Sequence, residues 1–224
     1  MTGAAHDPHA DARLLRVGPP PGESPVGMVL IHGRGDSAQG ILSLLPHLHE
    51  RGAPELTAIA PDAVGNVWYP QRFMQPIEHN QPHLDAALRV VSDAVAVLER
   101  GGLPRERIVI AGFSQGACLA LDWVARQGGS FGAVVALSGG LIGASVDPAR
   151  YPHRLDGTVA FLGCSDVDAH IPEARVHASA QQLQAQGADV TTRIYPGMAH
   201  TVNDDELQWL AQRLRQLATA HGAS

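Results

Sequence analysis

The sequence predicts an α/β fold, a single domain whose mainly parallel sheet carries helices on both faces. Three observations lead to this prediction. Short apolar runs typical of buried strands alternate with amphipathic helical patterns along the chain. A content of 45% hydrophobic and 17% charged residues in 224 is enough for one sizeable core. Polar clusters follow several of the strands, at the edge of the sheet where α/β proteins place their sites.

The whole chain is expected to divide into two sections. Residues 1–25 are expected to form a loop-rich extension with an edge strand at 12–17, closed by a run of prolines. Residues 26–224 are expected to form the main domain, which starts with a buried strand at 27–32. A serine then caps a helix at 37–48, whose leucines lie on one side.

The middle of the chain contains a strand at 56–60 followed by a long loop at 63–82. Long loops in compact domains are usually functional, and the aromatic and methionine content of this one indicates an ordered loop that covers something apolar. Apolar residues at i, i+4 and i+7 spacing predict an amphipathic helix at 84–98, which two glycines end. A buried strand at 108–111 and a helix at 117–125 follow.

The carboxyl-terminal part continues the alternation of strands and helices. A proline opens its first helix, and Asn203 or Asp204 lies at the start of its second. The expected segments are a strand at 133–137, an irregular stretch at 141–157, a strand at 158–162, a helix at 172–187, a strand at 190–195 and a helix at 207–217. This order predicts right-handed crossovers between parallel strands.

The candidate nucleophile lies between the strand at 108–111 and the helix at 117–125. Gly112-Phe113-Ser114-Gln115-Gly116 fits the pattern G-x-S-x-G. In a nucleophile elbow the serine occupies a strained turn that projects its hydroxyl above the sheet, and the flanking glycines avoid clashes between strand and helix. The helix N-terminus adds N–H groups and positive potential. This context favours Ser114 as a nucleophile over an incidental serine in a glycine-rich turn.

A serine nucleophile needs a base and an acid that orients the base. His200 is the best base, because it follows the last strand in a loop and completes the chain order Ser, Asp, His of α/β-hydrolases. His32 is better placed to orient a loop, and His170 lies too near the acid candidates. The acid is Asp166 or Asp168, both at the end of one strand, and the residues alone leave this choice open.

The developing negative charge of an attacked carbonyl needs two N–H donors. The backbone N–H of Gln115 and that of Arg34, in the loop after the first buried strand, are the candidates for this oxyanion hole. Gly33 and Gly35 let that loop come close to the nucleophile. The loop matches neither G-x-x-x-x-G-K-[ST] nor G-x-G-x-x-G, so nucleotide binding is not expected.

The composition excludes several other classes. A net charge of −6 without a run of basic residues argues against a nucleic-acid partner. The histidines are scattered, so no metal site is expected, and those at positions 6, 9, 47 and 49 are predicted to lie on the surface. Cys118 and Cys164 are expected to be buried, inert thiols. The polar N-terminus and the lack of a long apolar run predict a cytoplasmic protein with no membrane span.

The chain from Met28 onward resembles the phospholipase/carboxylesterase family of α/β-hydrolases, which includes acyl-protein thioesterases and small bacterial carboxylesterases. The resemblance rests on four motifs in order: His32-Gly33-Arg34-Gly35-Asp36-Ser37, Gly112-Phe113-Ser114-Gln115-Gly116-Ala117, Asp168-Ala169-His170-Ile171-Pro172 and Tyr195-Pro196-Gly197-Met198-Ala199-His200. It implies Asp168 as the acid, since the family aspartate stands three residues before Ile-Pro or Val-Pro. It also implies Arg34 and Gln115 as the oxyanion donors, and a monomer or homodimer.

Two features depart from the general family pattern. Many members have leucine where this chain has Arg34, whose guanidinium is expected to narrow the entrance or attract an anionic substrate. The Trp68-Tyr69-Pro70 loop resembles a bacterial subgroup often labelled phospholipase or dienelactone hydrolase. Dienelactone hydrolases proper use cysteine as the nucleophile, so the serine of this elbow weakens that label.

The function expected from the residues and the resemblance together is that of a serine hydrolase without a cofactor. It would cleave small carboxylic esters, thioesters or lysophospholipids through an acyl-enzyme. Trp68, Tyr69, Phe73 and Met74 would line or cover the acyl pocket, the alternative being plain packing of the loop. Two other functions stay open: a non-catalytic protein that binds acyl ligands, and dienelactone hydrolysis or acyl transfer to a different acceptor at the same site.

Overall fold

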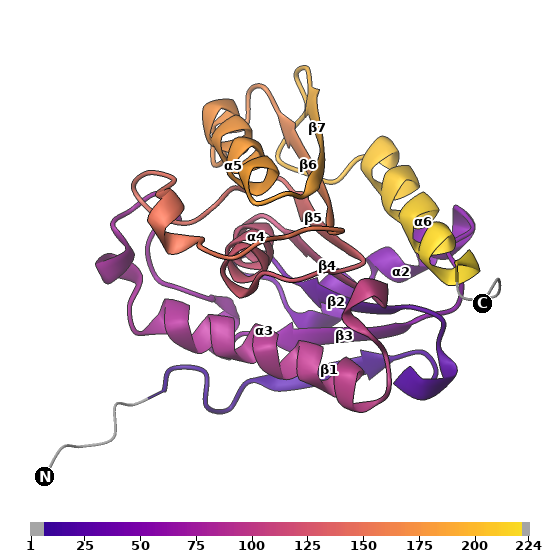
Figure 1. Cartoon of the computed structure of the whole chain (residues 1–224). Helices are drawn as coiled ribbons and strands as arrows, with labels where there is room; N and C mark the ends of the chain where they lie inside the picture. The colour runs from indigo at the N-terminus through magenta and orange to yellow at the C-terminus, as the bar shows by residue number, and fades with distance from the viewer. Residues whose placement is uncertain (1–6, 221–224) are drawn as a thin grey trace, which may run out of the picture.

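A seven-stranded sheet with the order β1-β3-β2-β4-β5-β6-β7 forms the centre of the computed structural model (Figure 1). The structure describes residues 7–220. Only β1, at one edge, runs antiparallel to its neighbour, and the other pairs are parallel. The strands are β1 (Arg13–Val17), β2 (Gly27–Ile31), β3 (Thr57–Asp62), β4 (Ile108–Phe113), β5 (Ala133–Leu137), β6 (Val159–Ser165) and β7 (Asp189–Tyr195). The predicted mainly parallel α/β fold is confirmed.

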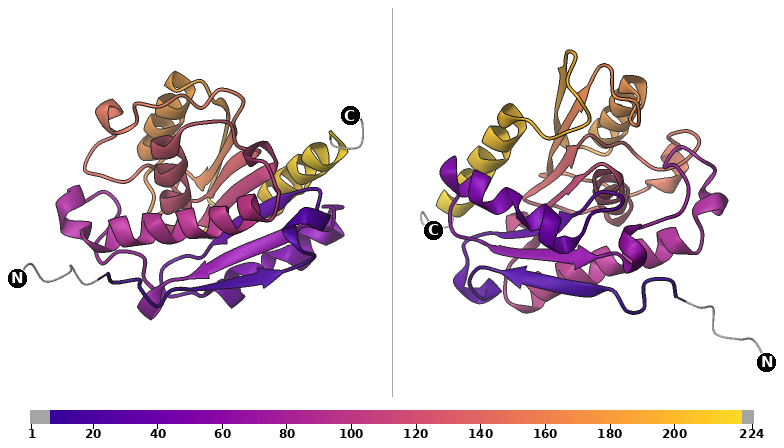
Figure 2. Two further views of the ribbon diagram at one scale, coloured as in Figure 1. Left: turned by 60° about the horizontal axis from the view of Figure 1, so that its bottom comes forward. Right: turned by 180° about the vertical axis from the view of Figure 1, so that it is seen from behind.

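Helices cover both faces of the sheet, and each face has its own apolar cluster. One cluster joins the sheet to α3, α4 and α5, and the other joins it to α1, α2 and α6. Figure 2 shows the molecule from two further directions, with helices on both sides of the sheet. The helices are α1 (Ala38–Leu42), α2 (Leu44–Glu50), α3 (His83–Arg100), α4 (Gln115–Gln127), α5 (Glu173–Ala185) and α6 (Asp204–Thr219), with 3-10 turns at Pro21–Glu23, Val64–Asn66, Ile77–Asn80, Arg105–Arg107 and Pro148–Arg150. Among residues 7–220, no helix combines the length and apolar character needed to cross a membrane.

The elements differ from the sequence predictions in two places. The single helix expected at 37–48 is wrong, because α1 ends at Leu42 and α2 begins at Leu44. Pro46 has no N–H to donate to the carbonyl group of Leu42, so a continuous helix would lose a hydrogen bond there. The third strand was expected to end before Pro61, but it continues to Asp62 because β1 pairs with it, Leu14 opposite Pro61.

The start of α6 fixes the end of the loop that carries His200. The Asn203 side chain accepts a hydrogen bond from the N–H of Glu206, and the Glu206 carboxylate accepts one from the N–H of Asn203, which makes a capping box. Glu206 is fully buried, and its second carboxylate oxygen has no partner in the described part of the chain. Burial raises the pKa of Glu206 from 4.5 to about 7.

We expect Glu206→Gln to stabilise the protein in alkaline solution. An acid whose pKa is raised by folding holds its proton in the folded state over the interval between about 4.5 and about 7, so the free energy of unfolding falls as pH rises through that interval. The shift corresponds to about 3 kcal/mol. Glutamine keeps the acceptor for Asn203 and carries no charge. Urea denaturation should therefore show the variant more stable than wild type at about pH 8 and nearly equal to it at about pH 5.

The matched control for this prediction is Glu55→Gln, which neutralises an exposed carboxylate. This change should leave the pH dependence of the free energy of unfolding as in wild type. A wild-type protein whose stability stays constant over the same pH interval would contradict the assignment of the buried charge to Glu206.

Candidate active site

Ser114 occupies the sharp turn between β4 and α4. Its backbone has φ 55° and ψ −117°, a conformation that costs a non-glycine residue energy and that occurs mostly at functional sites. A Cβ on Gly112 would lie 2.4 Å from the carbonyl group of Gly116, and a Cβ on Gly116 would lie 2.2 Å from the carbonyl oxygen of Ile31. Only glycine fits these two positions, because strand and helix are in backbone contact there.

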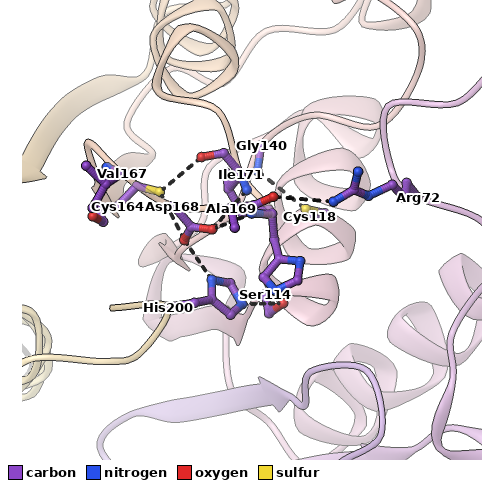
Figure 3. A network of polar contacts seen from close by, with 12 residues as sticks. Arg72, Ser114, Cys118, Gly140, Cys164, Val167, Asp168, Ala169, Ile171 and His200 are labelled. Atoms are coloured by element: carbon purple, nitrogen blue, oxygen red, sulfur yellow. Dashed lines mark hydrogen bonds and ion pairs between the residues drawn. The ribbon is translucent and has the colours of Figure 1, made fainter. Parts of the chain in front are cut away.

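The side chains of Ser114, His200 and Asp168 form one hydrogen-bonded chain (Figure 3). Nε2 of His200 lies 2.8 Å from Oγ of Ser114, and Nδ1 of His200 lies 2.6 Å from Oδ2 of Asp168. Ser114 follows β4, Asp168 follows β6 and His200 follows β7. These residues are therefore brought together at the carboxyl ends of three parallel strands, where α/β folds place their sites.

The surroundings of Asp168 favour its ionised form. Oδ1 accepts hydrogen bonds from the N–H groups of His170, at 2.8 Å, and Ile171, at 3.0 Å. Burial raises the pKa of this carboxyl group, but the hydrogen bonds from His200, His170 and Ile171 outweigh burial and hold the pKa below its usual value. Asp168 is thus a negatively charged hydrogen-bond acceptor for Nδ1–H of His200 at neutral pH.

The other candidates from the sequence lie around this chain in different roles. Asp166, which the residues alone could not exclude, accepts a hydrogen bond from the N–H of Gly197 at 2.8 Å and so supports the loop of His200. The ring of His170 contacts that of His200, with centroids 4.9 Å apart. His32 is fully buried: Nδ1 donates to the carbonyl oxygen of Gly33 and Nε2 accepts from the N–H of Ala63. It orients the loop, as predicted, and burial lowers its pKa.

A pocket of about 540 Å³ opens beside Ser114. Gly33, Arg34 and Gln115, which belong to the two segments of the predicted oxyanion hole, are among its lining residues. Among residues 7–220, no hydrogen bond within the protein uses the backbone N–H of Arg34 or of Gln115. Both donors are therefore available at the pocket that holds the serine hydroxyl.

The loop after β3 covers this pocket, but not with all the side chains expected from the sequence. Tyr69 and Phe73 line the pocket. Trp68 and Met74 are not among its lining residues, so their assignment to the pocket is wrong. Trp68 is fully buried, and its indole N–H donates to the carbonyl oxygen of His32. Met74 is partly buried against the core. Their packing beneath the loop holds the loop over the site.

The Gln115 side chain links the nucleophile elbow to the same loop. Its amide oxygen accepts a hydrogen bond from the N–H of Trp68 at 3.0 Å, and its amide nitrogen donates to the carbonyl oxygen of Tyr69 at 2.8 Å. Gln115 is buried, so both bonds are protected from water. The residue after Ser114 therefore fixes the loop that shapes the pocket.

His9 also holds this loop, which the sequence did not predict. Its assignment to the surface is wrong, because its side chain is only 1% exposed. Nε2 donates to the carbonyl oxygen of Trp68 at 2.9 Å, Nδ1 accepts from the N–H of Val64 at 3.2 Å, and burial lowers its pKa. His47 and His49 are exposed as predicted, and His6 lies outside the described residues. Nothing in the spacing of His9 could have indicated these contacts between distant segments.

Arg72 is a second residue that the sequence analysis missed. It lines the pocket, and its Nη2 donates to the carbonyl oxygen of Ala169 at 3.3 Å, which joins the loop after β3 to the loop of Asp168. A signal was present, since Arg72 is the single arginine of the loop at 63–82 and lies between Tyr69 and Phe73.

Both cysteines are buried and free, as predicted. Burial raises the pKa of each thiol to about 12, so both remain protonated at neutral pH. Cys118 nevertheless contributes to the lining of the pocket. In the part of the chain that the structure describes, no group of three or more His, Cys, Asp or Glu side chains could hold a metal ion.

A serine at a tight strand–helix turn in the middle of a mainly parallel sheet, hydrogen-bonded to a histidine that is itself hydrogen-bonded to an aspartate, is the arrangement that defines the class of α/β-hydrolases.

Within this class the chain matches one family over nearly its whole length. Residues 17–218 match the phospholipase/carboxylesterase family. Lysophospholipase-like protein 1 of Mus musculus is 27% identical, over 87% of this chain and 90% of its own length. Acyl-protein thioesterase 1 of Saccharomyces cerevisiae is 27% identical, over 84% of this chain and 91% of its own. A phospholipase/carboxylesterase from Dyadobacter fermentans superposes with a TM-score of 0.86 at 37% identity, over 91% of this chain and 96% of its own.

The chain therefore belongs to the phospholipase/carboxylesterase family and is a carboxylic ester hydrolase. This result confirms the family, the fold class and the enzyme class predicted from the sequence.

Proposed function

We propose that this protein hydrolyses carboxylic esters and thioesters through a triad of Ser114, His200 and Asp168 and a covalent acyl-enzyme. The observation that carries the proposal is the continuous hydrogen-bonded chain from Oγ of Ser114 through both nitrogens of His200 to Asp168. A serine hydroxyl is a weak nucleophile at neutral pH, and a base held in the correct tautomer is what activates it.

In the first half of the reaction Oγ of Ser114 attacks the carbonyl carbon of the substrate while Nε2 of His200 takes the hydroxyl proton. Asp168 accepts the hydrogen bond from Nδ1 and balances the charge of the imidazolium ion. His200 then gives its proton to the leaving alcohol or thiol, and the acyl group stays on Ser114. In the second half, a water molecule attacks the acyl carbon and gives its proton to His200. His200 then returns a proton to Oγ of Ser114 as the bond to the acyl group breaks, and the carboxylic acid is released.

The attacked carbonyl oxygen becomes negatively charged, and we assign its binding to the backbone N–H groups of Arg34 and Gln115. This assignment is supported by their segments lining the same pocket as Ser114 and by the absence, among residues 7–220, of any other acceptor for either N–H within the protein. The Gln115 N–H also lies at the N-terminus of α4, whose dipole favours negative charge. One such donor typically accounts for about a hundredfold or more in rate.

The substrate range is proposed from the relatives and from the pocket. The relatives are named lysophospholipase-like protein, acyl-protein thioesterase and carboxylesterase. A pocket of about 540 Å³ with Tyr69, Phe73 and Ile171 in its lining suits an acyl group of moderate length. A second hollow of about 480 Å³ shares Phe113 and His200 with the first, so space exists on both sides of the reacting centre.

The test is a series of p-nitrophenyl esters and matching thioesters, from acetyl to dodecanoyl, with rapid-mixing detection of the first turnover. We expect hydrolysis, a burst of p-nitrophenol that marks acyl-enzyme formation, and an optimum acyl length that reports the depth of the pocket. A fluorophosphonate probe should label Ser114, as identified by peptide mass spectrometry. A folded protein that neither hydrolyses any ester nor reacts with the probe would contradict the proposal and favour a binding protein.

A further inference from the structure

Two arginines lie at the pocket that contains Ser114. Arg34 follows β2, and Arg72 belongs to the loop after β3; both line the pocket and both are exposed. The only other residue with a full formal charge in the described lining is Asp36. The chain as a whole has a net charge of −6, so this pocket carries the opposite sign to the molecule around it.

Both guanidinium groups are held in place by backbone carbonyl oxygens. Nη2 of Arg34 donates to the carbonyl oxygens of Tyr69, at 2.7 Å, and Gln71, at 3.0 Å. Nη2 of Arg72 donates to the carbonyl oxygen of Ala169 at 3.3 Å, beside Asp168 and His200 (Figure 3). The Arg34 side chain is therefore anchored to the segment just before Arg72, and the Arg72 side chain is anchored to the loop that carries Asp168.

The positive charges of these arginines are not neutralised by the protein. Within residues 7–220, no carboxylate forms an ion pair with Arg34 or Arg72, and Nε and Nη1 of each make no hydrogen bond. Other arginines, such as Arg13, Arg89 and Arg193, each pair with an aspartate. Carbonyl groups orient a guanidinium group without cancelling its charge, so the free N–H donors of the pair remain available to an anion.

Asp36 does not compensate the pair. Its carboxylate lies against the first turn of α1, where a Cβ on Gly40 would come within 1.9 Å of Oδ1. In the described part of the chain, the Asp36 carboxylate forms no ion pair with Arg34 or Arg72. The nearby Asp62 does not pair with them either, since its arginine partner is Arg13. The imidazole rings of His170 and His200 complete the polar lining, and neither adds a permanent negative charge.

From this arrangement we infer that the substrate carries an anionic group, a carboxylate or a phosphate, close to its reacting ester, and that Arg34 and Arg72 bind this group. The inference rests on the proposed function and names the substrate class of the same site. The free Nε–H and Nη1–H groups of the arginines can donate to a carboxylate or a phosphate, and such charge-assisted bonds are about twice as strong as neutral ones. The anion can belong to the acyl part or to the alcohol part of the ester.

The experiment compares matched pairs of anionic and neutral esters. Mono-p-nitrophenyl succinate against p-nitrophenyl butyrate places the carboxylate on the acyl part, and 4-(butyryloxy)benzoate against phenyl butyrate places it on the alcohol part. The measured quantity is kcat/KM for the anionic ester divided by kcat/KM for its neutral partner, in wild type, Arg34→Met and Arg72→Met. Taking this ratio cancels general losses of activity in a variant. Arg100→Met, which removes an exposed charge at the end of α3, is the control for net charge.

We expect the ratio of at least one pair to fall about tenfold or more in Arg72→Met and in Arg34→Met, and to stay as in wild type in Arg100→Met. Added salt should lower the wild-type ratio because it screens the arginines. The pair that responds identifies the part of the ester that carries the anion. Equal ratios in wild type and in both pocket variants, for both pairs, would overturn the inference while hydrolysis of the neutral esters left the proposed function intact.

A binding measurement tests anion recognition by the arginines independently of ester hydrolysis. Ser114→Ala protein is titrated by calorimetry with each anionic ester and with its neutral partner, and the titrations are repeated with a Ser114→Ala protein that also carries Arg72→Met. Tighter binding of either anionic ester than of its neutral partner, lost with Arg72→Met, supports the anion site even if the wild type turned out to hydrolyse nothing. Equal affinities of the anionic and neutral esters in both proteins would overturn it.

Discussion

Ser114→Ala is expected to lower kcat for p-nitrophenyl esters by about 10⁵- to 10⁶-fold, to the level of a site without a nucleophile. Alanine removes the hydroxyl that lies 2.8 Å from Nε2 of His200 and leaves the rest of the hydrogen-bonded chain in place. The residual rate would come from the oxyanion donors and substrate binding alone. Steady-state kinetics with wild type and variant measure the loss, and fluorophosphonate labelling should disappear with it.

The same position provides a control for folding. Ser114 has a positive φ that glycine adopts without strain, and such strain costs about 1–3 kcal/mol. Ser114→Gly should therefore be inactive and yet unfold at a higher urea concentration than Ser114→Ala. This pairing distinguishes a lost nucleophile from a damaged fold. Hydrolysis by well-folded Ser114→Ala at the wild-type rate would show that another group attacks the ester.

Asp168→Asn is expected to lower kcat by about 10⁴-fold without unfolding the protein. Both oxygens of Asp168 accept hydrogen bonds, Oδ2 from His200 and Oδ1 from the N–H groups of His170 and Ile171. An asparagine must turn its NH₂ group toward one of these donors. If the side-chain oxygen of the asparagine stays with the two backbone N–H groups, its NH₂ group faces Nδ1 of His200. Nδ1 then accepts a hydrogen bond from this NH₂ group, and the proton of the imidazole moves to Nε2. A protonated Nε2 cannot take the proton of Ser114.

Asp166→Asn is the matched control, since it changes the same residue type two positions earlier in the same loop. Asp166 accepts a single backbone hydrogen bond, from Gly197, and an asparagine oxygen can still accept it. Its kcat should stay within a few-fold of wild type. If Asp166→Asn lost as much activity as Asp168→Asn, the assignment of the acid to Asp168 would be wrong, or the loop of His200 would depend on the charge of Asp166.

The sequence was a good guide to the elements and to the elbow because these depend on short stretches of chain. Apolar runs predict strands such as β5, and the pattern of leucines predicts α6, since side-chain periodicity decides which face is buried. Gly112 is required by a backbone contact with Gly116, a few residues away, whereas Gly116 is required by the contact of α4 with Ile31 at the end of β2. The single helix expected at 37–48 was wrong because Pro46 interrupts its backbone hydrogen bonds. This effect is local and can be read from the sequence, but the regular spacing of the leucines favoured one continuous helix.

The choice between Asp166 and Asp168 could not be made from the residue types, because both carboxylates follow β6 and only the path of the loop turns one toward His200. Resemblance to the family favours Asp168, and in the structure it is Asp168 whose carboxylate accepts the hydrogen bond from His200. Trp68, expected in the pocket, packs beneath the loop because its indole N–H finds a buried acceptor in the carbonyl group of His32. An aromatic side chain in a loop has no periodicity to say which way it points.

Local sequence patterns determine the fold class, the order of the strands along the chain and the position of a serine at a tight strand–helix turn. Each of these patterns lies within a short stretch of the chain. Other contacts join residues as many as 97 positions apart in the chain. They include the hydrogen bond of His9 to Trp68 and the hydrogen bonds that anchor Arg34 and Arg72 near Ser114. Such contacts depend on how packed elements bring loops together, and a loop side chain takes the direction in which its polar atoms find partners.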